Sequence, residues 1–116
     1  MKTHMVVIEF ARRYGIKEGL VLTELCRRAC VSGANQVPFS VSQGKAFFPY
    51  MSEKQIRVSL HNLKTAGCIS IAHSSPTVDR TQKYCVQENI YKFYAQIIMA
   101  NQLAFPGETE PQAGGQ

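Results

Sequence analysis

The chain lacks the long apolar runs of membrane proteins. None of its stretches approaches the ~20 consecutive apolar residues that a membrane-spanning helix needs. The N-terminus also lacks a basic start followed by an apolar run and a small-residue cleavage site, so we expect no signal peptide. We therefore predict a cytoplasmic protein that has no membrane partner and whose cysteines stay reduced.

Motifs for catalysis and for nucleotide hydrolysis are also missing. The sequence has no Gly-rich phosphate-binding loop. Neither His61 nor His73 is accompanied by a carboxylate cluster or an activated nucleophile in a recognisable motif. We predict a noncatalytic protein that uses no cofactor.

Cysteines are few, and no two of them form a Cys-x-x-Cys motif. Cys26 and Cys30 are four residues apart in a segment with helical spacing, whereas Cys68 and Cys85 fall in runs that read as neighbouring strands. The flanking residues are apolar, which favours buried free thiols over the alternative, a zinc site. We predict no bound metal.

Acidic residues are outnumbered by basic ones, 8 against 13, which gives a formal charge of +5. Glu108 and Glu110 lie in a tail without Lys or Arg, so the part before the tail carries +7. An excess of positive charge favours association with polyanions. The length corresponds to one domain, which we place at 1–104, followed by a flexible tail at 105–116 with no aliphatic side chain larger than Ala.

A short helix with defined ends is predicted over 52–66. Ser52 fits the N-cap position, and Gln55 completes a capping box with it. Gly67 then supplies a residue that commonly ends a helix. The apolar positions of this segment recur at helical spacing and share one face: Ile56, Leu60 and Leu63.

The other faces of this helix carry cations and hydrogen-bond donors. The simplest interpretation of such a surface is an amphipathic helix facing solvent, and the alternative is a surface that meets a partner. The side chains concerned are Lys54, Gln55, Arg57, Val58, His61, Asn62 and Lys64.

The rest of the chain contains further helical and extended patterns. A long helix is predicted over 16–31, with Lys17, Glu24, Arg27 and Arg28 on its charged face. Ser42 is predicted to cap a two-turn helix over 42–48 that Pro49 ends. The remaining elements are an extended lead-in or short strand with a brief helix ended by Gly15, an extended edge segment at 36–41, strands at 68–73 and 81–86 joined by a loose tip at 74–80, and a helix at 88–103.

Helix, extended segment, helix, helix, strand, strand is the order of a winged helix. Residues 52–69 resemble the pattern in which a Ser-capped recognition helix closes on a Gly and leads into a strand. Residues 47–51, Phe-Phe-Pro-Tyr-Met, resemble the aromatic-Pro turn of the N-terminal domains of phage and bacterial replisome organisers, the DnaD-like group. Residues 11–22 are similar to their entry into the first long helix. The resemblance covers roughly 5–87 and implies an α+β winged helix-turn-helix fold, a three-helix core with a β-hairpin wing, to which a C-terminal helix is added.

Two positions depart from the pattern of that group. Gly19 stands where related sequences more often have Ala, which weakens the helix start by ~1 kcal/mol. The aromatic residue, often Trp, that commonly precedes the second helix is replaced by Phe39-Ser40-Val41.

The resemblance implies binding of double-stranded DNA, with the helix at 52–66 in the major groove and the hairpin at 68–87 reaching phosphate or the minor groove. Side chains near a helix start meet base edges, so Lys54, Gln55 and Val58 are placed to read bases. Arg57 and His61 lie behind these three, and Ser52 marks the start of the reading surface. Phosphate contacts, which position the protein without specifying sequence, would come from Ser42, Lys45, Lys64, Arg80 and Lys83.

Two functions remain open from the sequence. The first is noncatalytic binding of duplex DNA in replication initiation or transcription regulation, in a phage or bacterial protein with replication proteins as partners. The second is a protein-interaction or oligomerisation scaffold that uses the same fold without reading DNA. Glu53 favours the second, because a carboxylate at the start of the reading helix repels phosphate.

The predicted helix at 88–103 raises the question of oligomeric state. It carries more apolar surface than a single face needs, which predicts a homodimer that pairs through this helix. The alternative is that it packs over the first long helix and completes the core of the monomer. The large side chains concerned are Tyr91, Tyr94, Ile98, Met99 and the following Phe105.

Overall fold

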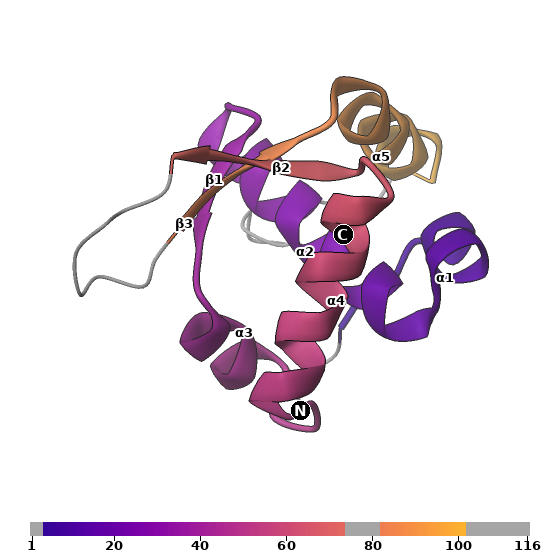
Figure 1. Cartoon of the computed structure of the whole chain (residues 1–116). Helices are drawn as coiled ribbons and strands as arrows, with labels where there is room; N and C mark the ends of the chain where they lie inside the picture. Colours follow the sequence, from indigo (N-terminus) through magenta and orange to yellow (C-terminus); the bar gives the residue numbers. More distant parts are fainter. Residues whose placement is uncertain (1–3, 74–81, 102–116) are drawn as a thin grey trace, which may run out of the picture.

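A computed structural model describes residues 4–73 and 82–101 of the chain (Figure 1). This part of the chain is an α+β structure with five helices and one three-stranded antiparallel sheet. None of these helices has the length and hydropathy that crossing a membrane requires. The elements are α1 (Ile8–Tyr14), α2 (Ile16–Ser32), β1 (Gln36–Phe39), α3 (Val41–Phe47), α4 (Glu53–Thr65), β2 (Ile69–His73), β3 (Gln82–Val86) and α5 (Glu88–Ala100).

The sheet has the strand order β1-β3-β2, so β3 is its central strand. β1 pairs antiparallel with β3, and Phe39 lies opposite Gln82. β2 pairs with the other edge of β3, with a shift in register between Ile71 and His73. β1 is an edge strand, as the sequence predicts. The edge position suits Pro38, because proline has no amide hydrogen to donate to a strand on the open side. The predicted hairpin tip at 74–80 and the tail at 105–116 lie outside the described residues.

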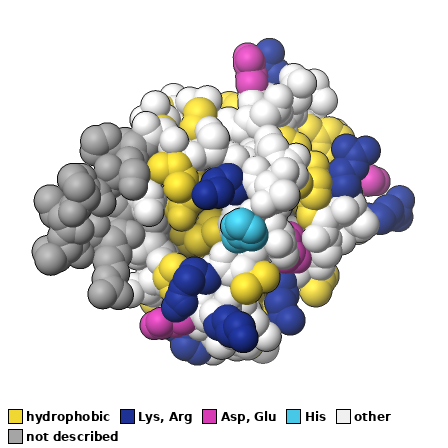
Figure 2. Space-filling view, viewed as in Figure 1, with side chains coloured by type: hydrophobic (Ala, Val, Ile, Leu, Met, Phe, Trp, Pro, Cys, Tyr) yellow, Lys and Arg dark blue, Asp and Glu magenta, His cyan; other side chains and the backbone are white. Residues whose placement is uncertain are grey.

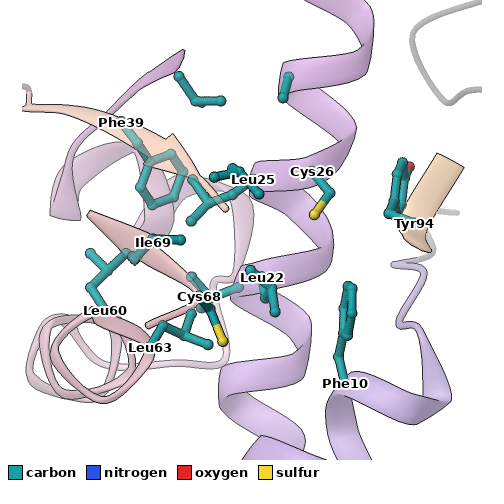
Figure 3. Close-up of a cluster of buried hydrophobic side chains, with 14 of the residues drawn as sticks. Phe10, Leu22, Leu25, Cys26, Phe39, Leu60, Leu63, Cys68, Ile69 and Tyr94 are labelled. Carbon is teal, nitrogen blue, oxygen red and sulfur yellow. The ribbon is translucent and has the colours of Figure 1, made fainter. Parts of the chain in front are cut away.

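The hydrophobic core forms around α2, which packs against α1, α4, α5 and strands of the sheet. Figure 3 shows Leu22, Leu25 and Cys26 of α2 between side chains that come from the sheet and α4 on one side and from α1 and α5 on the other. The side chains that meet α2 in this view are Phe10, Phe39, Leu60, Leu63, Cys68, Ile69 and Tyr94.

The charged face predicted for α2 is not fully solvated. Glu24 is 4% exposed, and its carboxylate accepts hydrogen bonds from Arg27 Nη2 and Arg28 Nε, both at 2.6 Å. The guanidinium of Arg28 also lies 5.0 Å from the ring centre of Phe39. Glu24, which its spacing places on the charged face, is therefore buried, and two arginines within one turn replace water around its carboxylate.

Gly19 has a packing role that helix propensity does not reveal. A Cβ atom at this position would lie 2.8 Å from the Cα and the backbone nitrogen of Ala11. α1 therefore crosses α2 at a distance that only Gly permits at this point. The loss of helix propensity at Gly19 is offset by the close packing of the two helices.

The N-caps of α3 and α4 are both serine capping boxes. Ser52 accepts from the amide of Gln55 at 3.0 Å, and the Gln55 side chain accepts from the amide of Ser52 at 2.9 Å, which confirms the predicted cap of α4. The predicted cap of α3 is wrong: Ser40, with Gln43 as its reciprocal partner, caps this helix. Ser42 lies one residue inside the helix, which begins at Val41 because the extended backbone of β1 continues through Ser40.

The first and last helices begin differently. Residues 4–7 form no strand, so the lead-in to α1 is extended chain rather than a sheet element. At the start of α5, the side-chain oxygen of Gln87 accepts from the amide of Ile90 at 3.1 Å. Tyr94 and Ile98 are 0% and 1% exposed and close the core over α2, so these two side chains are not available for self-association, whereas Met99 is 73% exposed.

Candidate nucleic-acid interface

The inward face of α4 anchors this helix to the rest of the molecule. Ile56, Leu60 and Leu63 are buried, as their spacing predicts, and Ser59 between them is 1% exposed. α4 packs against α2 and α3. On the α3 side the approach is close, because a Cβ atom at Gly44 would lie 2.9 Å from Ile56 Cγ2. The position of α4 is therefore fixed from two sides.

The outward face of α4 is open to solvent. Lys54, Arg57, His61 and Lys64 are all exposed, and Val58 is 46% exposed beside them. Figure 2, viewed as in Figure 1, shows Lys and Arg side chains on both sides of a histidine over α4, with hydrophobic side chains between them. α4 thus presents a mixed cationic and apolar surface.

A groove of about 260 Å³ runs between α4 and the sheet. Arg57, His61 and Lys64, spaced by four and three residues along α4, bring three of the predicted DNA-binding side chains to this groove. Burial raises the pKa of Tyr84 further above neutrality, so its phenol is protonated and able to donate at pH 7. The other lining residues are Ser40, Val41, Leu60, Ile71 and Gln82.

Glu53 is the one acidic residue of α4. Its carboxylate lies 3.8 Å from the guanidinium of Arg57, and both side chains are 58% exposed. An exposed pair at this spacing contributes only about 0.3 to 0.5 kcal/mol, so it does not hold Arg57 away from a stronger anion. Glu53 also stands in the first turn of α4, where a carboxylate interacts favourably with the helix dipole.

Gln55 serves the cap of α4, and this limits what it can read. Its side-chain oxygen is engaged by the amide of Ser52 at 2.9 Å, which leaves its NH₂ group to donate. Bidentate pairing of Gln with adenine uses the oxygen to accept and the NH₂ to donate. Because adenine and guanine both present the N7 acceptor, a Gln55 side chain in this conformation would not distinguish the two purines if it met bases.

The predicted phosphate contacts outside α4 are scattered over other elements. Ser42 and Lys45 are exposed on α3, and Lys45 Nζ donates to the backbone oxygen of Pro49 at 3.0 Å. Lys83 is exposed on β3. Arg80 lies outside the described residues. The structure therefore brings Arg57, His61 and Lys64 together at one groove, whereas Ser42, Lys45 and Lys83 do not line it.

Sequence reasoning missed the residues that form the other wall of the groove. Ile71, Gln82 and Tyr84 belong to β2 and β3 and reach the groove only through the register of the sheet. Ser40 was detectable, because Ser40 and Gln43 repeat the spacing of the Ser52 and Gln55 capping box.

The cysteines do not form a metal centre in the part of the chain that the structure describes. No three His, Cys, Asp or Glu side chains in this part converge on a common point, and all four cysteines are free thiols. Burial, followed by the neighbouring Cys30 and Cys68, raises the pKa of Cys26 far above its usual value. A buried thiol of this kind is unreactive. Cys26 and Cys68 are buried as expected, whereas Cys30 and Cys85 are only partly buried.

No protein-family model, curated protein or solved structure matches this chain.

Proposed function

We propose that this chain is a winged helix-turn-helix domain that binds double-stranded DNA without catalysing a reaction. In this proposal α3 and α4 are the helix-turn-helix, α4 enters the major groove, and β2 and β3 form the wing beside it. Support comes from the order of the elements, in which β1 separates the first helices from α3 and α4, and two antiparallel strands follow α4.

One observation carries the proposal: the cationic face of α4 is exposed, and its apolar face is anchored to α2 and α3. A helix held in this way can enter a groove of the duplex without losing contacts to its own core. The positive charges also favour DNA over other partners, because neutralising phosphates releases counterions.

The role proposed for each side chain of α4 depends on its distance from the N-terminus of the helix. Lys54 and Val58 stand near the helix start, where base edges come within reach, and an exposed Val suits the thymine methyl group. Arg57, which lies between these two residues in the sequence, can pair bidentately with guanine. His61 and Lys64 lie further along the groove wall and approach phosphates.

The biological process follows from the same surface and from the resemblance to replisome organisers. We place the chain in replication initiation or transcription regulation, with replication proteins as partners in the first case. A scaffold for protein assembly is the second candidate, and one observation favours it: an apolar groove between α1 and α5 lies outside α4 and the sheet.

Salt-dependent binding to a labelled duplex tests the DNA proposal. We expect Arg57→Ala and Lys64→Ala each to weaken binding. Lys64→Ala should also lower the slope of log affinity against log salt by about 1, since it removes a phosphate-facing charge, whereas Arg57→Ala removes a base-facing one. Fluorescence anisotropy between about 50 mM and about 200 mM salt measures both quantities. Lys92→Ala is the matched control, because it removes the same charge from an exposed site on α5.

Two outcomes would contradict the proposal. The first is the absence of salt-dependent binding below about 100 μM, since even nonspecific duplex binding falls in the 10⁻⁴ to 10⁻⁶ M range. The second is an equal loss of affinity in Lys92→Ala and Arg57→Ala. This result would mean that affinity depends only on the net charge of the protein and that DNA does not bind at α4.

A further inference from the structure

α1 and α5 enclose a groove of about 550 Å³ whose floor is apolar. Phe10 of α1 and Phe93 of α5 meet across it, with ring centres 5.9 Å apart. Ile90, Phe93 and Ile97 line it and are only partly covered by the chain itself. Three large apolar side chains on one helix are thus left partly exposed on the same side.

This groove is separate from the proposed DNA surface. None of its lining residues belongs to α3, α4 or the sheet. In Figure 1, α1 and α5 lie on one side of the molecule while α4 crosses its front. A protein bound in the groove would leave the cationic side chains of α4 exposed.

The rim of the groove carries charges of both signs in a regular arrangement. Glu9 and Arg13 of α1 line the same side of the groove and are one helical turn apart. Glu9 also lies 3.8 Å from Arg12, a pair so exposed that it does not fix the carboxylate in place. If two such helices run antiparallel across a two-fold axis, each acid faces a base of the other helix.

We propose that the groove between α1 and α5 binds a second copy of this chain in a two-fold symmetric dimer. The α1 helices run antiparallel, so that Glu9 pairs with the partner's Arg13 and Arg13 with the partner's Glu9. Ile90, Phe93 and Ile97 are buried beneath these pairs. This self-complementary order of charge selects a second copy over an unrelated helix, and the dimer does not depend on DNA binding.

The apolar part of the interface is tested by light scattering on the full chain across about 1 μM to about 500 μM, with dimer at the upper end. Ile97→Lys is expected to raise the dimer dissociation constant by at least ~10-fold. Met99→Lys adds the same charge to the same helix at a side chain outside the groove, and it should leave the constant unchanged. Circular dichroism checks that both variants fold.

The charge arrangement is tested by two reversals and their mixture. Glu9→Arg places like charges opposite each other across the axis, and Arg13→Glu does the same with the opposite sign, so each variant alone should be monomeric. Mixed in equal amounts, the two variants should form a heterodimer, because every acid again faces a base.

A monomer at every concentration would overturn the proposal, as would equal effects of Ile97→Lys and Met99→Lys. Failure of the two reversal variants to associate when mixed would overturn the antiparallel arrangement. Duplex binding by Ile97→Lys is measured alongside. If that binding persists while the dimer is lost, the DNA proposal stands on its own, whereas an intact dimer that does not bind DNA would leave the dimer proposal standing.

Discussion

Tyr94 is fully buried on α5, and its hydroxyl has no hydrogen-bond partner in the described part of the chain. Glu24 shows the opposite case, because its buried carboxylate accepts from two arginines. A buried hydroxyl without a partner loses its hydrogen bonds to water and gains none in return. Tyr94 therefore stabilises the core through its ring and weakens it through its oxygen.

We predict that Tyr94→Phe raises the free energy of unfolding by about 1 kcal/mol, because it removes the unpaired hydroxyl and keeps the ring. Urea denaturation of the two proteins measures the difference. Tyr91→Phe is the matched control on the same helix, since Tyr91 is only partly buried and the loss of its hydroxyl should not stabilise the protein. A fall in stability for Tyr94→Phe would show that the hydroxyl has a partner.

Single residues were predictable where the interaction is local in sequence. The capping box of Ser52 and Gln55 spans four residues, and the pattern alone identified it. The burial of Glu24 was not predictable, because periodicity places a charged residue on a face but does not say which other element covers that face. Gly19 was misjudged for the same reason, since its partner is the backbone of Ala11 on another helix.

At the scale of elements, the contact between α3 and α4 sets how α4 is presented. Gly44 of α3 allows this contact, because a Cβ atom there would lie 2.9 Å from Ile56 and 3.2 Å from the ring of Phe39. Both neighbours are fully buried and have no space to move into. Overpacking at this point would push the two helices apart.

We predict that Gly44→Ala destabilises the protein by about 1 to 2 kcal/mol, although Ala is the better helix former by about 1 kcal/mol. Thermal unfolding followed by circular dichroism measures the change. Ser42→Ala is the control on the same helix, because Ser42 is exposed and does not cap it. If Gly44→Ala instead stabilises the protein, α3 and α4 can move apart at this point without losing packing energy, which would contradict the prediction.

Most elements were predictable from periodicity and from turn residues, and their observed ends differ from the predicted ones by at most three residues. The prediction of where α3 starts was wrong because two serines, Ser40 and Ser42, can both serve as its N-cap. The choice depends on the extended backbone that leaves β1, and this in turn depends on pairing with β3, more than forty residues away. The sheet residues that line the groove beside α4 could not be predicted for the same reason, since their positions depend on the register of β2 and β3.

For the molecule as a whole, the buried thiols and phenols couple stability to pH. Burial raises the pKa of Cys26, and burial followed by the nearby thiols raises that of Tyr94. In the unfolded chain a thiol releases its proton near pH 8.5, whereas in the folded protein Cys26 keeps it. Above that pH the unfolded state binds fewer protons, so the free energy of unfolding falls as pH rises.

We predict a steady loss of stability above about pH 8.5 in reducing buffer, to which Cys26 contributes up to about 1.4 kcal/mol per pH unit. Cys26→Ala should flatten this slope by about that amount, whatever it does to the stability at neutral pH. Urea denaturation at several pH values between about 7 and about 10 measures it. Equal slopes in the two proteins above pH 8.5 would contradict the prediction, while equal slopes below it are expected.

The short strand β1 joins parts of the molecule that would otherwise act separately. Phe39, its last residue, lies opposite Gln82 at the start of β3, and the next residue, Ser40, caps α3. Separating β1 from β3 would therefore also loosen the first turn of α3. The base of the hairpin, the start of α3 and, through Gly44, the seating of α4 form one cooperative unit, so a pull on the hairpin is transmitted mechanically to the helix at the front of the molecule.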